Sequence, residues 1–276
     1  MTARIFIGTL AIDAWPADAR AIAYGDGVFE TMRVHRGSVP WWDAHWERLS
    51  LGAQRLRLSL PAQAQVREEA TALFDDGGDG VLKLLLSRGG AGRGYTAVSD
   101  AAPIWMVSRH SLPPALPSDK RAGLILHWCA TWLAPQPLLA GIKHCNRLEQ
   151  ILARAECDDA GADEGLVCDH DGMVVSATAA NVFVWRDGRW WTPLVDRCGV
   201  AGVCRSRLIP SLDAIEAHLS TEDVEGAEAV FLCNAVRGIL AVAQLGARTW
   251  PSHRVIDDAR RELARIHPGF SFDLTP

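Results

Sequence analysis

The sequence lacks any apolar run long enough to cross a membrane, although 49% of its 276 residues are hydrophobic. A membrane-spanning helix needs about 20 consecutive apolar residues. Residues 1–13 also lack the charged, apolar and small-residue segments of a secretion signal. We therefore expect a globular cytosolic protein with no membrane partner.

The sequence also lacks paired cysteines and a basic block. Its seven cysteines are an odd number without a C-x-x-C pair, which fits neither a disulfide framework nor a zinc site. We expect reduced thiols that pack as small hydrophobic side chains, and no metal. No Lys/Arg block is longer than a pair and the net charge is −5. Because nucleic-acid phosphates need a basic surface, we expect no nucleic-acid partner.

Lysine is scarce, with only Lys83, Lys120 and Lys143 among 28 basic residues. An enzyme that forms a Schiff base with its cofactor therefore has three candidates. Lys83 lies on one face of a predicted strand, and Lys120 lies in a polar linker. Lys143 follows a Pro/Leu/Gly segment and directly precedes a predicted helix, where a side chain can be aimed into a cleft. By frequency alone, a surface position would still be the better explanation for any single lysine.

Hydrophobic periodicity predicts an α/β arrangement for the first part of the chain. The predicted strands are 4–10, 27–34, 81–87 and 104–108. Apolar residues from Trp42 to Leu56 recur at 4-3-4-3 spacing, which places them on one face of a helix. A glycine-rich segment, 88–95, separates two of the strands. Together these elements predict a smaller N-terminal domain, residues 1–112.

The second part of the chain is predicted to be rich in strands. Prolines in 113–120 indicate a linker. Beyond it, in 121–276, apolar runs flank Asp169–Gly172 and Arg186–Gly188 as two hairpins. An amphipathic helix, 255–266, closes the chain. We therefore expect an α+β fold of two domains, the second one larger, with a cleft between them.

Four segments in order resemble the aminodeoxychorismate lyase branch of the fold type IV pyridoxal-phosphate enzymes. This group also contains D-amino acid and branched-chain aminotransferases. The segments are YGDGVFET (24–31) with HWERL (45–49), SRGGAGRGY (87–95), AGIKHCNRLEQ (140–150), and AAN (179–181) with TPLVDRCGV (192–200). The resemblance covers nearly the whole chain. It implies the D-amino acid aminotransferase-like fold, pyridoxal 5′-phosphate as cofactor, and a homodimer.

The resemblance also assigns roles to individual residues. It makes Lys143 the Schiff-base lysine and the general base. Arg48 would bind the cofactor phosphate with its planar guanidinium group, and this role is favoured over the alternative of a helix-surface arginine. The other implied cofactor-binding residues are Asn181 in the AAN motif, Gly199, Val200 and Ala201 in a turn that opens a helix, and Asn234 and Ala235 at the end of a strand.

The implied substrate carries two carboxylates, so its pocket should contain further cations. Arg88 and Arg93 in the glycine-rich segment are candidates, and Tyr95 could hydrogen-bond to the substrate or pack on its ring. A solvated loop tip explains either arginine equally well. Thr31 and Asn146 match positions that face the family's active site, and could orient the substrate or the lysine.

One position departs from the family pattern. Most members have a glutamate five residues before the motif asparagine, where it hydrogen-bonds the pyridine nitrogen of the cofactor, but here that residue is Ser176. A hydroxyl is no ionic partner, so we expect a neutral pyridine nitrogen, which weakens transamination more than elimination. The sequence thus favours a lyase that converts 4-amino-4-deoxychorismate to 4-aminobenzoate and pyruvate in folate biosynthesis. The alternatives are a D-amino acid or branched-chain aminotransferase, or a cofactor-binding homologue with lost or altered activity.

Overall fold

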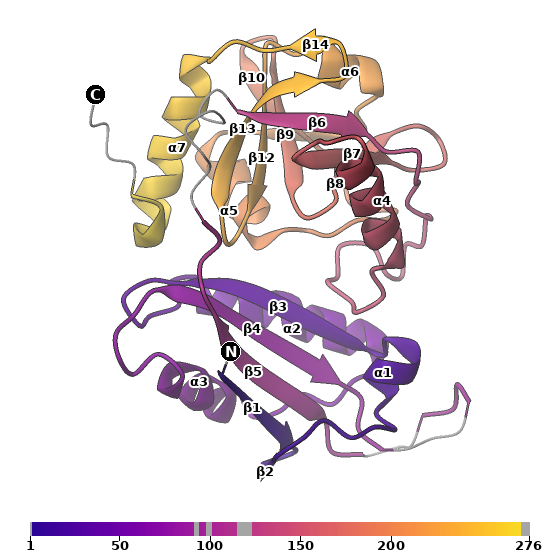
Figure 1. Cartoon of the computed structure of the whole chain (residues 1–276), viewed down its shortest axis with the longest axis vertical. Helices are drawn as coiled ribbons and strands as arrows, with labels where there is room; N and C mark the ends of the chain where they lie inside the picture. The colour runs from indigo at the N-terminus through magenta and orange to yellow at the C-terminus, as the bar shows by residue number, and fades with distance from the viewer. Residues whose placement is uncertain (1, 91–93, 98–100, 115–122, 272–276) are drawn as a thin grey trace. The chain divides into compact units, whose positions relative to one another are not determined.

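The structure is a computed structural model that describes residues 2–90, 94–97, 101–114 and 123–271 (Figure 1). The chain divides into two compact units. The first contains Met1–Leu112 with Ile142–Asn146, and the second contains Pro113–Gly141 with Arg147–Pro276. No helix in the described ranges is long and apolar enough to cross a membrane.

The first unit is an antiparallel sheet covered on one face by helices. The strand order is β2-β1-β5-β4-β3. The strands are β1 (Thr2–Ile7), β2 (Leu10–Ile12), β3 (Gly27–Val34), β4 (Gly80–Ser87) and β5 (Ile104–His110), and the helices are α1 (Arg20–Tyr24), α2 (Trp42–Leu56) and α3 (Gln63–Ala72). Apolar side chains of α2 and α3 pack with those of β3, β4 and β5 in one core, and α2 lies behind the sheet in Figure 1.

Side chains along β3 alternate between a buried face and a partly buried face. Val28, Glu30, Met32 and Val34 are buried on the helix-covered face, whereas the intervening side chains, from Phe29 to Arg33, are only partly buried. Successive residues of a strand point to opposite faces. The face away from the helices therefore carries Phe29 and Thr31.

The short segment Ile142–Asn146 belongs to the first unit, although it lies within the predicted second domain, residues 121–276. Its backbone pairs with β3: Phe29 N–H donates to the Lys143 carbonyl, and Cys145 N–H donates to the Gly27 carbonyl, both at 2.9 Å. The periodicity of a few residues cannot reveal such pairing, because it depends on a strand more than a hundred residues earlier in the chain.

The second unit is built on a sheet with the order β11-β10-β9-β12-β13-β6-β7-β8, and β14 also pairs with β13. The strands are β6 (Leu124–Trp128), β7 (Glu164–Cys168), β8 (Val174–Ala177), β9 (Asn181–Arg186), β10 (Arg189–Pro193), β11 (Ile215–Ala217), β12 (Ala229–Asn234), β13 (Gly238–Leu245) and β14 (Arg248–Thr249). The helices are α4 (Leu148–Asp159), α5 (Val203–Ser211), α6 (Thr221–Glu225), α7 (Arg254–Ile266) and the short 3-10 helix η2 (Pro268–Phe270). Helix α5 packs on β12, α7 packs on β12 and β13, and α4 packs on β7.

The predicted α+β class with a strand-rich second part is confirmed. Both predicted hairpins form, as β7 with β8 and as β9 with β10. The sheet of the second unit is mixed, since β6 pairs in parallel with both β7 and β13. All seven cysteines lie in the described part of the chain, none forms a disulfide, and six of them are buried, as expected for reduced thiols.

Candidate active site

Lys143 is held against the face of β3 that points away from the helices. Its backbone carbonyl accepts a hydrogen bond from Phe29, and the neighbouring residue His144 forms an isolated bridge with Val28. The Lys143 ammonium nitrogen, Nζ, lies 4.5 Å from the centroid of the Phe29 ring, where an aromatic face attracts a cation. Lys143 is therefore a partly buried side chain on a fixed backbone, not a solvated surface lysine.

A second lysine lies on the same face. Lys83 of β4 is opposite Thr31 in the register of β3 with β4, so their side chains point the same way. Its Nζ lies 5.4 Å from the same Phe29 centroid. Among the described residues, no carboxylate pairs with Lys83. Sequence reasoning placed Lys83 on a strand face but did not include it in the site, because the register with Thr31 was unknown.

Arg48 reaches from α2 to a buried carboxylate on β3. Its Nε donates to Glu30 Oε1 at 2.8 Å and its Nη2 donates to Oε2 at 2.5 Å. His45, one turn earlier on α2, approaches Glu30 Oε2 with Nδ1 at 2.6 Å. This pairing fixes the plane of the guanidinium group on which the predicted phosphate contact depends.

The charges in this trio follow from burial and pairing. Burial raises the pKa of Glu30, but the charge of Arg48 and the hydrogen bond from His45 outweigh it and hold the pKa at about 2. Burial also lowers the pKa of His45, and the charges of Arg48 and Lys143 add to this effect. A carboxylate only accepts, so a neutral His45 donates through Nδ1–H. Neither Glu30 nor His45 was among the predicted site residues, although both lie in the motifs that resemble the family.

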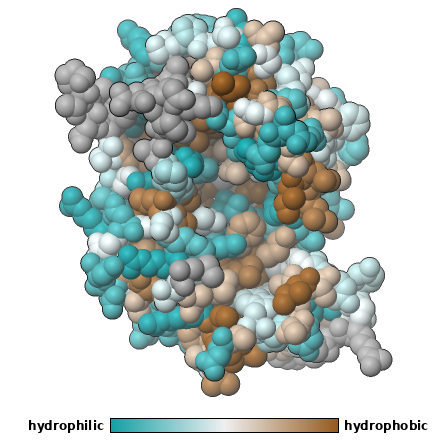
Figure 2. Space-filling model, viewed as in Figure 1, coloured by the Kyte–Doolittle hydropathy of each residue, from teal (hydrophilic) through white to brown (hydrophobic). Residues whose placement is uncertain are grey.

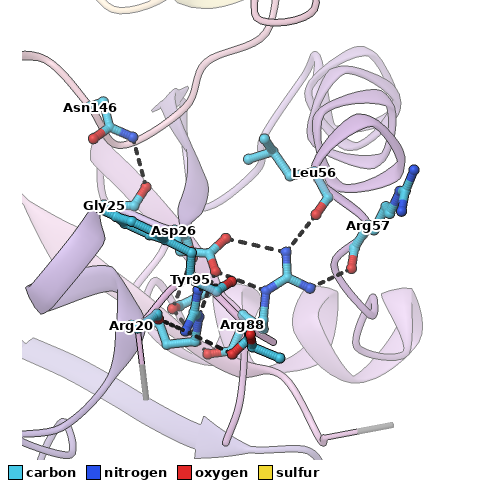
Figure 3. Close-up of polar contacts among 11 residues, drawn as sticks. Arg20, Gly25, Asp26, Leu56, Arg57, Arg88, Tyr95 and Asn146 are labelled. Atoms are coloured by element: carbon cyan, nitrogen blue, oxygen red, sulfur yellow. Dashed lines mark hydrogen bonds and ion pairs between the residues drawn. The ribbon is translucent and has the colours of Figure 1, made fainter. Parts of the chain in front are cut away.

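Arg88, predicted to bind a substrate carboxylate, donates to three acceptors within the protein. Its Nε donates to Asp26 Oδ2 at 2.8 Å, its Nη1 to the Arg57 carbonyl at 2.7 Å and its Nη2 to the Leu56 carbonyl at 2.5 Å (Figure 3). The two carbonyls lie at the C-terminal end of α2, where helix carbonyls have no partner within the helix and a cation is favoured. Arg88 therefore caps a helix.

The remaining predicted substrate residues of the first unit are spread over its loops. Arg93 lies outside the described residues. Tyr95 is 90% exposed, and its ring contacts that of Tyr24 at a centroid distance of 5.7 Å. Asn146 Nδ2 donates to the Gly25 carbonyl at 3.1 Å, so it ties the segment after Lys143 to the turn before β3.

In the second unit the structure brings together most of the predicted phosphate-binding residues. Asn181 Nδ2 donates to the Val200 carbonyl at 2.9 Å. On the other side of this turn, Gly141 N–H donates to the Gly199 carbonyl and Ala201 N–H donates to the Gly141 carbonyl, both at 3.0 Å. Gly199 has a φ of 85°, a conformation that favours glycine.

The turn leads into the N-terminus of α5. The N-cap residue, Gly202, supplies no side chain to the backbone N–H groups of the first helical turn. A Cβ atom at this position would overlap Asn181 Oδ1, so only glycine leaves the asparagine in place. Exposed backbone N–H groups at the start of a helix are a suitable binding site for a phosphate.

The other predicted residues of the second unit lie close by. Asn234 ends β12, one residue after Cys233, which pairs with Asn181. Its Oδ1 accepts from the backbone N–H groups of Val236 and Arg237, and its Nδ2 donates to the Ala179 carbonyl, so the turn containing Ala235 is well ordered. The buried Ser176 hydroxyl donates to the Ala177 carbonyl at 2.9 Å.

Comparisons with known proteins identify the family of this chain. The Amino-transferase class IV family matches residues 27–245. The chain is 33% identical over 238 residues to an aminodeoxychorismate lyase of Vibrio harveyi, across 84% of this chain and 88% of that protein. The solved 4-amino-4-deoxychorismate lyase of Pseudomonas aeruginosa is 38% identical with a TM-score of 0.86, covering 95% and 98% of the two chains. A PLP-bound hypothetical aminotransferase from Mycobacterium tuberculosis, 20% identical, shares the fold with a TM-score of 0.81 over 96% and 99% of the chains. The chain therefore belongs to the class IV aminotransferase family of pyridoxal-phosphate enzymes.

Proposed function

We propose that this chain is an aminodeoxychorismate lyase, which converts 4-amino-4-deoxychorismate to 4-aminobenzoate and pyruvate in folate biosynthesis. The observation that carries the proposal is the pair of lysines, Lys143 and Lys83, over one aromatic ring on the open face of β3 and β4. The names of the relatives from Vibrio harveyi and Pseudomonas aeruginosa support the same reaction.

The residues fit pyridoxal phosphate. An aldehyde needs an amine on a fixed backbone, which Lys143 offers. A phosphate needs several donors, which the uncapped start of α5 and the turn held by Asn181 supply, and Arg48 carries a permanent charge. When bound, the cofactor supplies the aldehyde that takes up an amino group and the ring that draws electrons from the neighbouring carbon.

Lys143 serves as the general base in this proposal. It removes the proton from the amine-bearing ring carbon of the substrate. The electron pair of that C–H bond enters the ring as the bond to the enolpyruvyl oxygen breaks. The ring becomes aromatic, and the released enolpyruvate becomes pyruvate after protonation on carbon.

Lys83 takes the place of Arg88 as the proposed cation for a substrate carboxylate. Arg88 already donates to three protein acceptors, whereas Lys83 points to the same open face as Thr31. A hydrogen bond from an ammonium group to a carboxylate is stronger than one between neutral groups. Thr31, beside Lys83, would then orient the bound substrate.

Ser176 favours elimination over transamination. Its hydroxyl donates to the Ala177 carbonyl, and it brings no carboxylate to the position where most relatives have glutamate. Without an ionic partner, the pyridine nitrogen stores less negative charge. Transamination, which needs that storage for longer, suffers more than an elimination that expels its leaving group at once.

We also propose a cytosolic homodimer. Along α4, the side chains of Leu148, Ile151 and Leu152 are 75%, 61% and 60% exposed, at a spacing that places them on one face of the helix. Figure 2 shows hydrophobic surface, in brown, over this helix. An exposed apolar patch of this kind marks a protein interface. The absence of disulfides among all seven cysteines, which the structure describes, supports a reducing compartment.

The test is pyruvate release from 4-amino-4-deoxychorismate by purified protein loaded with cofactor. We expect Lys143→Ala to abolish pyruvate release and the absorbance band of lysine-bound cofactor. Lys83→Met should keep the band but lower kcat/KM by about 10- to 100-fold, the loss expected for one hydrogen bond to a charged group. Lys120→Ala, at the remaining lysine in the sequence, is the control, and it should change neither the release of pyruvate nor the absorbance band.

The other outcomes separate the alternatives. Wild-type protein with the absorbance band but no pyruvate would overturn the lyase assignment. Amino transfer from D-alanine or leucine to a keto acid would then identify an aminotransferase. Neither activity would identify a homologue that only binds the cofactor.

A further inference from the structure

The turn between α1 and β3, Gly25–Gly27, is bound to the segment that carries Lys143. The Gly25 carbonyl accepts from Asn146 Nδ2 at 3.1 Å (Figure 3). The Gly27 carbonyl accepts from Cys145 N–H at 2.9 Å. Gly25 has a φ of 61°, and a Cβ atom there would lie 2.7 Å from Asn146 Oδ1. Any shift of this turn therefore reaches the lysine-bearing segment.

The same turn is bound to the glycine-rich loop through the side chain of its central residue. Asp26 Oδ2 accepts from Arg20 Nε and from Arg88 Nε, each at 2.8 Å. Arg20 also donates to three successive loop carbonyls, those of Gly94 at 3.1 Å and of Tyr95 and Thr96 at 3.4 Å. Arg20 is thus a direct bridge between the Asp26 carboxylate and the loop backbone.

The bridge is well shielded from solvent. The side chains of Arg20, Asp26 and Arg88 are only 6%, 15% and 16% exposed. Burial raises the pKa of Asp26, but hydrogen bonds from Arg88 and Arg20 outweigh it, so the pKa lies below its usual value. The carboxylate is therefore charged at neutral pH, and it is the shared partner of both guanidinium groups. Without it, two shielded cations would face each other.

We infer that Asp26 is a positioning residue that couples the Gly94–Thr96 loop to the backbone segment carrying Lys143. The loop holds Tyr95, a proposed substrate residue, and the segment holds the proposed general base. Through the Gly25–Gly27 turn, Asp26 fixes the position of the loop relative to the segment. The consequence for catalysis rests on the proposed lyase function, whereas the coupling itself does not.

The coupling can be measured without activity, by hydrogen exchange of the cofactor-loaded protein. We expect Asp26→Asn, which keeps the shape but removes the charge, to speed amide exchange at least tenfold in peptides covering 94–97 and in peptides covering 142–146. The matched control is Asp76→Asn, since Asp76 also pairs with an arginine of this unit, Arg109, at 2.9 Å. In the control variant, amide exchange should be unchanged in both sets of peptides.

Faster exchange in 94–97 alone, or in neither peptide, would overturn the proposal. If Asp26→Asn does not fold, Arg20→Gln leaves the Asp26–Arg88 pair in place and must still speed exchange in both peptides. Acceleration confined to the loop in that variant would count against the coupling.

A kinetic measurement adds a readout that general destabilisation would not give. We expect Asp26→Asn to raise KM for 4-amino-4-deoxychorismate about tenfold while the absorbance band of lysine-bound cofactor persists, and Asp26→Glu to recover part of the loss. Loss of the band with unchanged KM would contradict the proposal. If the wild-type protein releases no pyruvate, the lyase assignment fails, but the exchange result still decides the coupling.

Discussion

At the scale of single residues, Glu30 is the clearest source of pH dependence. Its pKa is lowered from 4.5 to about 2 in the folded protein, because Arg48 and His45 outweigh the effect of burial. The contribution of Glu30 to the stability of the fold is therefore complete above pH 4.5 and is lost as the pH falls through about 2. A lowering of this size corresponds to about 3 kcal/mol of folding free energy.

We predict that Glu30→Gln lowers the free energy of unfolding at pH 7 by about 3 kcal/mol, because Arg48 and His45 then lose a buried charged acceptor. The measurement is urea denaturation at pH 7 and at several values between 4.5 and 2. Over that range the variant should lose less stability than the wild type.

The control for this prediction is Glu69→Gln. Glu69 pairs with Arg4 at 2.5 Å, but the Arg4 side chain is 44% exposed. Such a pair contributes below about 1 kcal/mol. Equal losses in the two variants would show that the buried position of Glu30 has no special importance.

At the scale of elements, the start of α5 depends on the absence of a side chain at Gly202. We predict that Gly202→Ala raises the dissociation constant of pyridoxal phosphate at least tenfold, because the added Cβ overlaps Asn181 Oδ1 and displaces the turn at Val200. The measurement is a cofactor titration followed by absorbance.

A glycine far from this turn provides the control. Gly161 has a φ of 65° and open space around a Cβ, so Gly161→Ala introduces only backbone strain, about 1 kcal/mol. It should lower stability without changing cofactor affinity. Equal affinity in both variants would argue against a phosphate at the start of α5.

The apolar face of α4 makes a prediction about assembly. If the wild-type protein is the proposed homodimer, we expect Ile151→Glu to be a monomer, because a charge buried in an apolar interface opposes association. Light scattering after size-exclusion chromatography gives the mass directly. Leu60→Glu, at an apolar residue of the other unit that is 42% exposed, is the control and should remain dimeric. If the Ile151→Glu variant is still a dimer, α4 is not part of the interface.

At the scale of the whole molecule, the predicted cofactor-binding residues are divided between the two units. Lys143 and Arg48 belong to the first unit, and Asn181, Gly199 and Asn234 belong to the second. A ligand that binds only the folded form of a protein stabilises it.

We therefore predict that removing the cofactor with hydroxylamine lowers Tm by about 5 to 10 °C, relative to protein with cofactor at 100 times its Kd. Hydrogen exchange should become faster in β4 and in β9, one strand from each unit. In the Lys143→Ala variant, adding the cofactor should raise Tm by less than in the wild type. Faster exchange in only one unit would contradict the assignment of residues from both.

The sequence predicted the longer elements well and the shorter ones poorly. The predicted ranges for β3 and α2 match the structure, because alternation and 4-3-4-3 spacing are direct consequences of one buried face. The short helices α1 and α6 contain only five residues each, too few to show a helical period. Pro210 and the weak apolar pattern of α5 concealed that helix beyond its first turn.

By itself the sequence determined the class of fold and the family, and it singled out Lys143 for the cofactor, because periodicity and ordered motifs are properties of residues close together in the chain. It pointed to Arg88 and Arg93 as cations for the substrate and left Lys83 out, since it does not give strand register. Only the tertiary structure shows that Lys83 lies opposite Thr31 and that Arg88 donates to α2 and Asp26. Register and buried ion pairs join residues far apart in sequence, so the folded chain alone determines which charges are committed to the protein and which face the open side of the sheet.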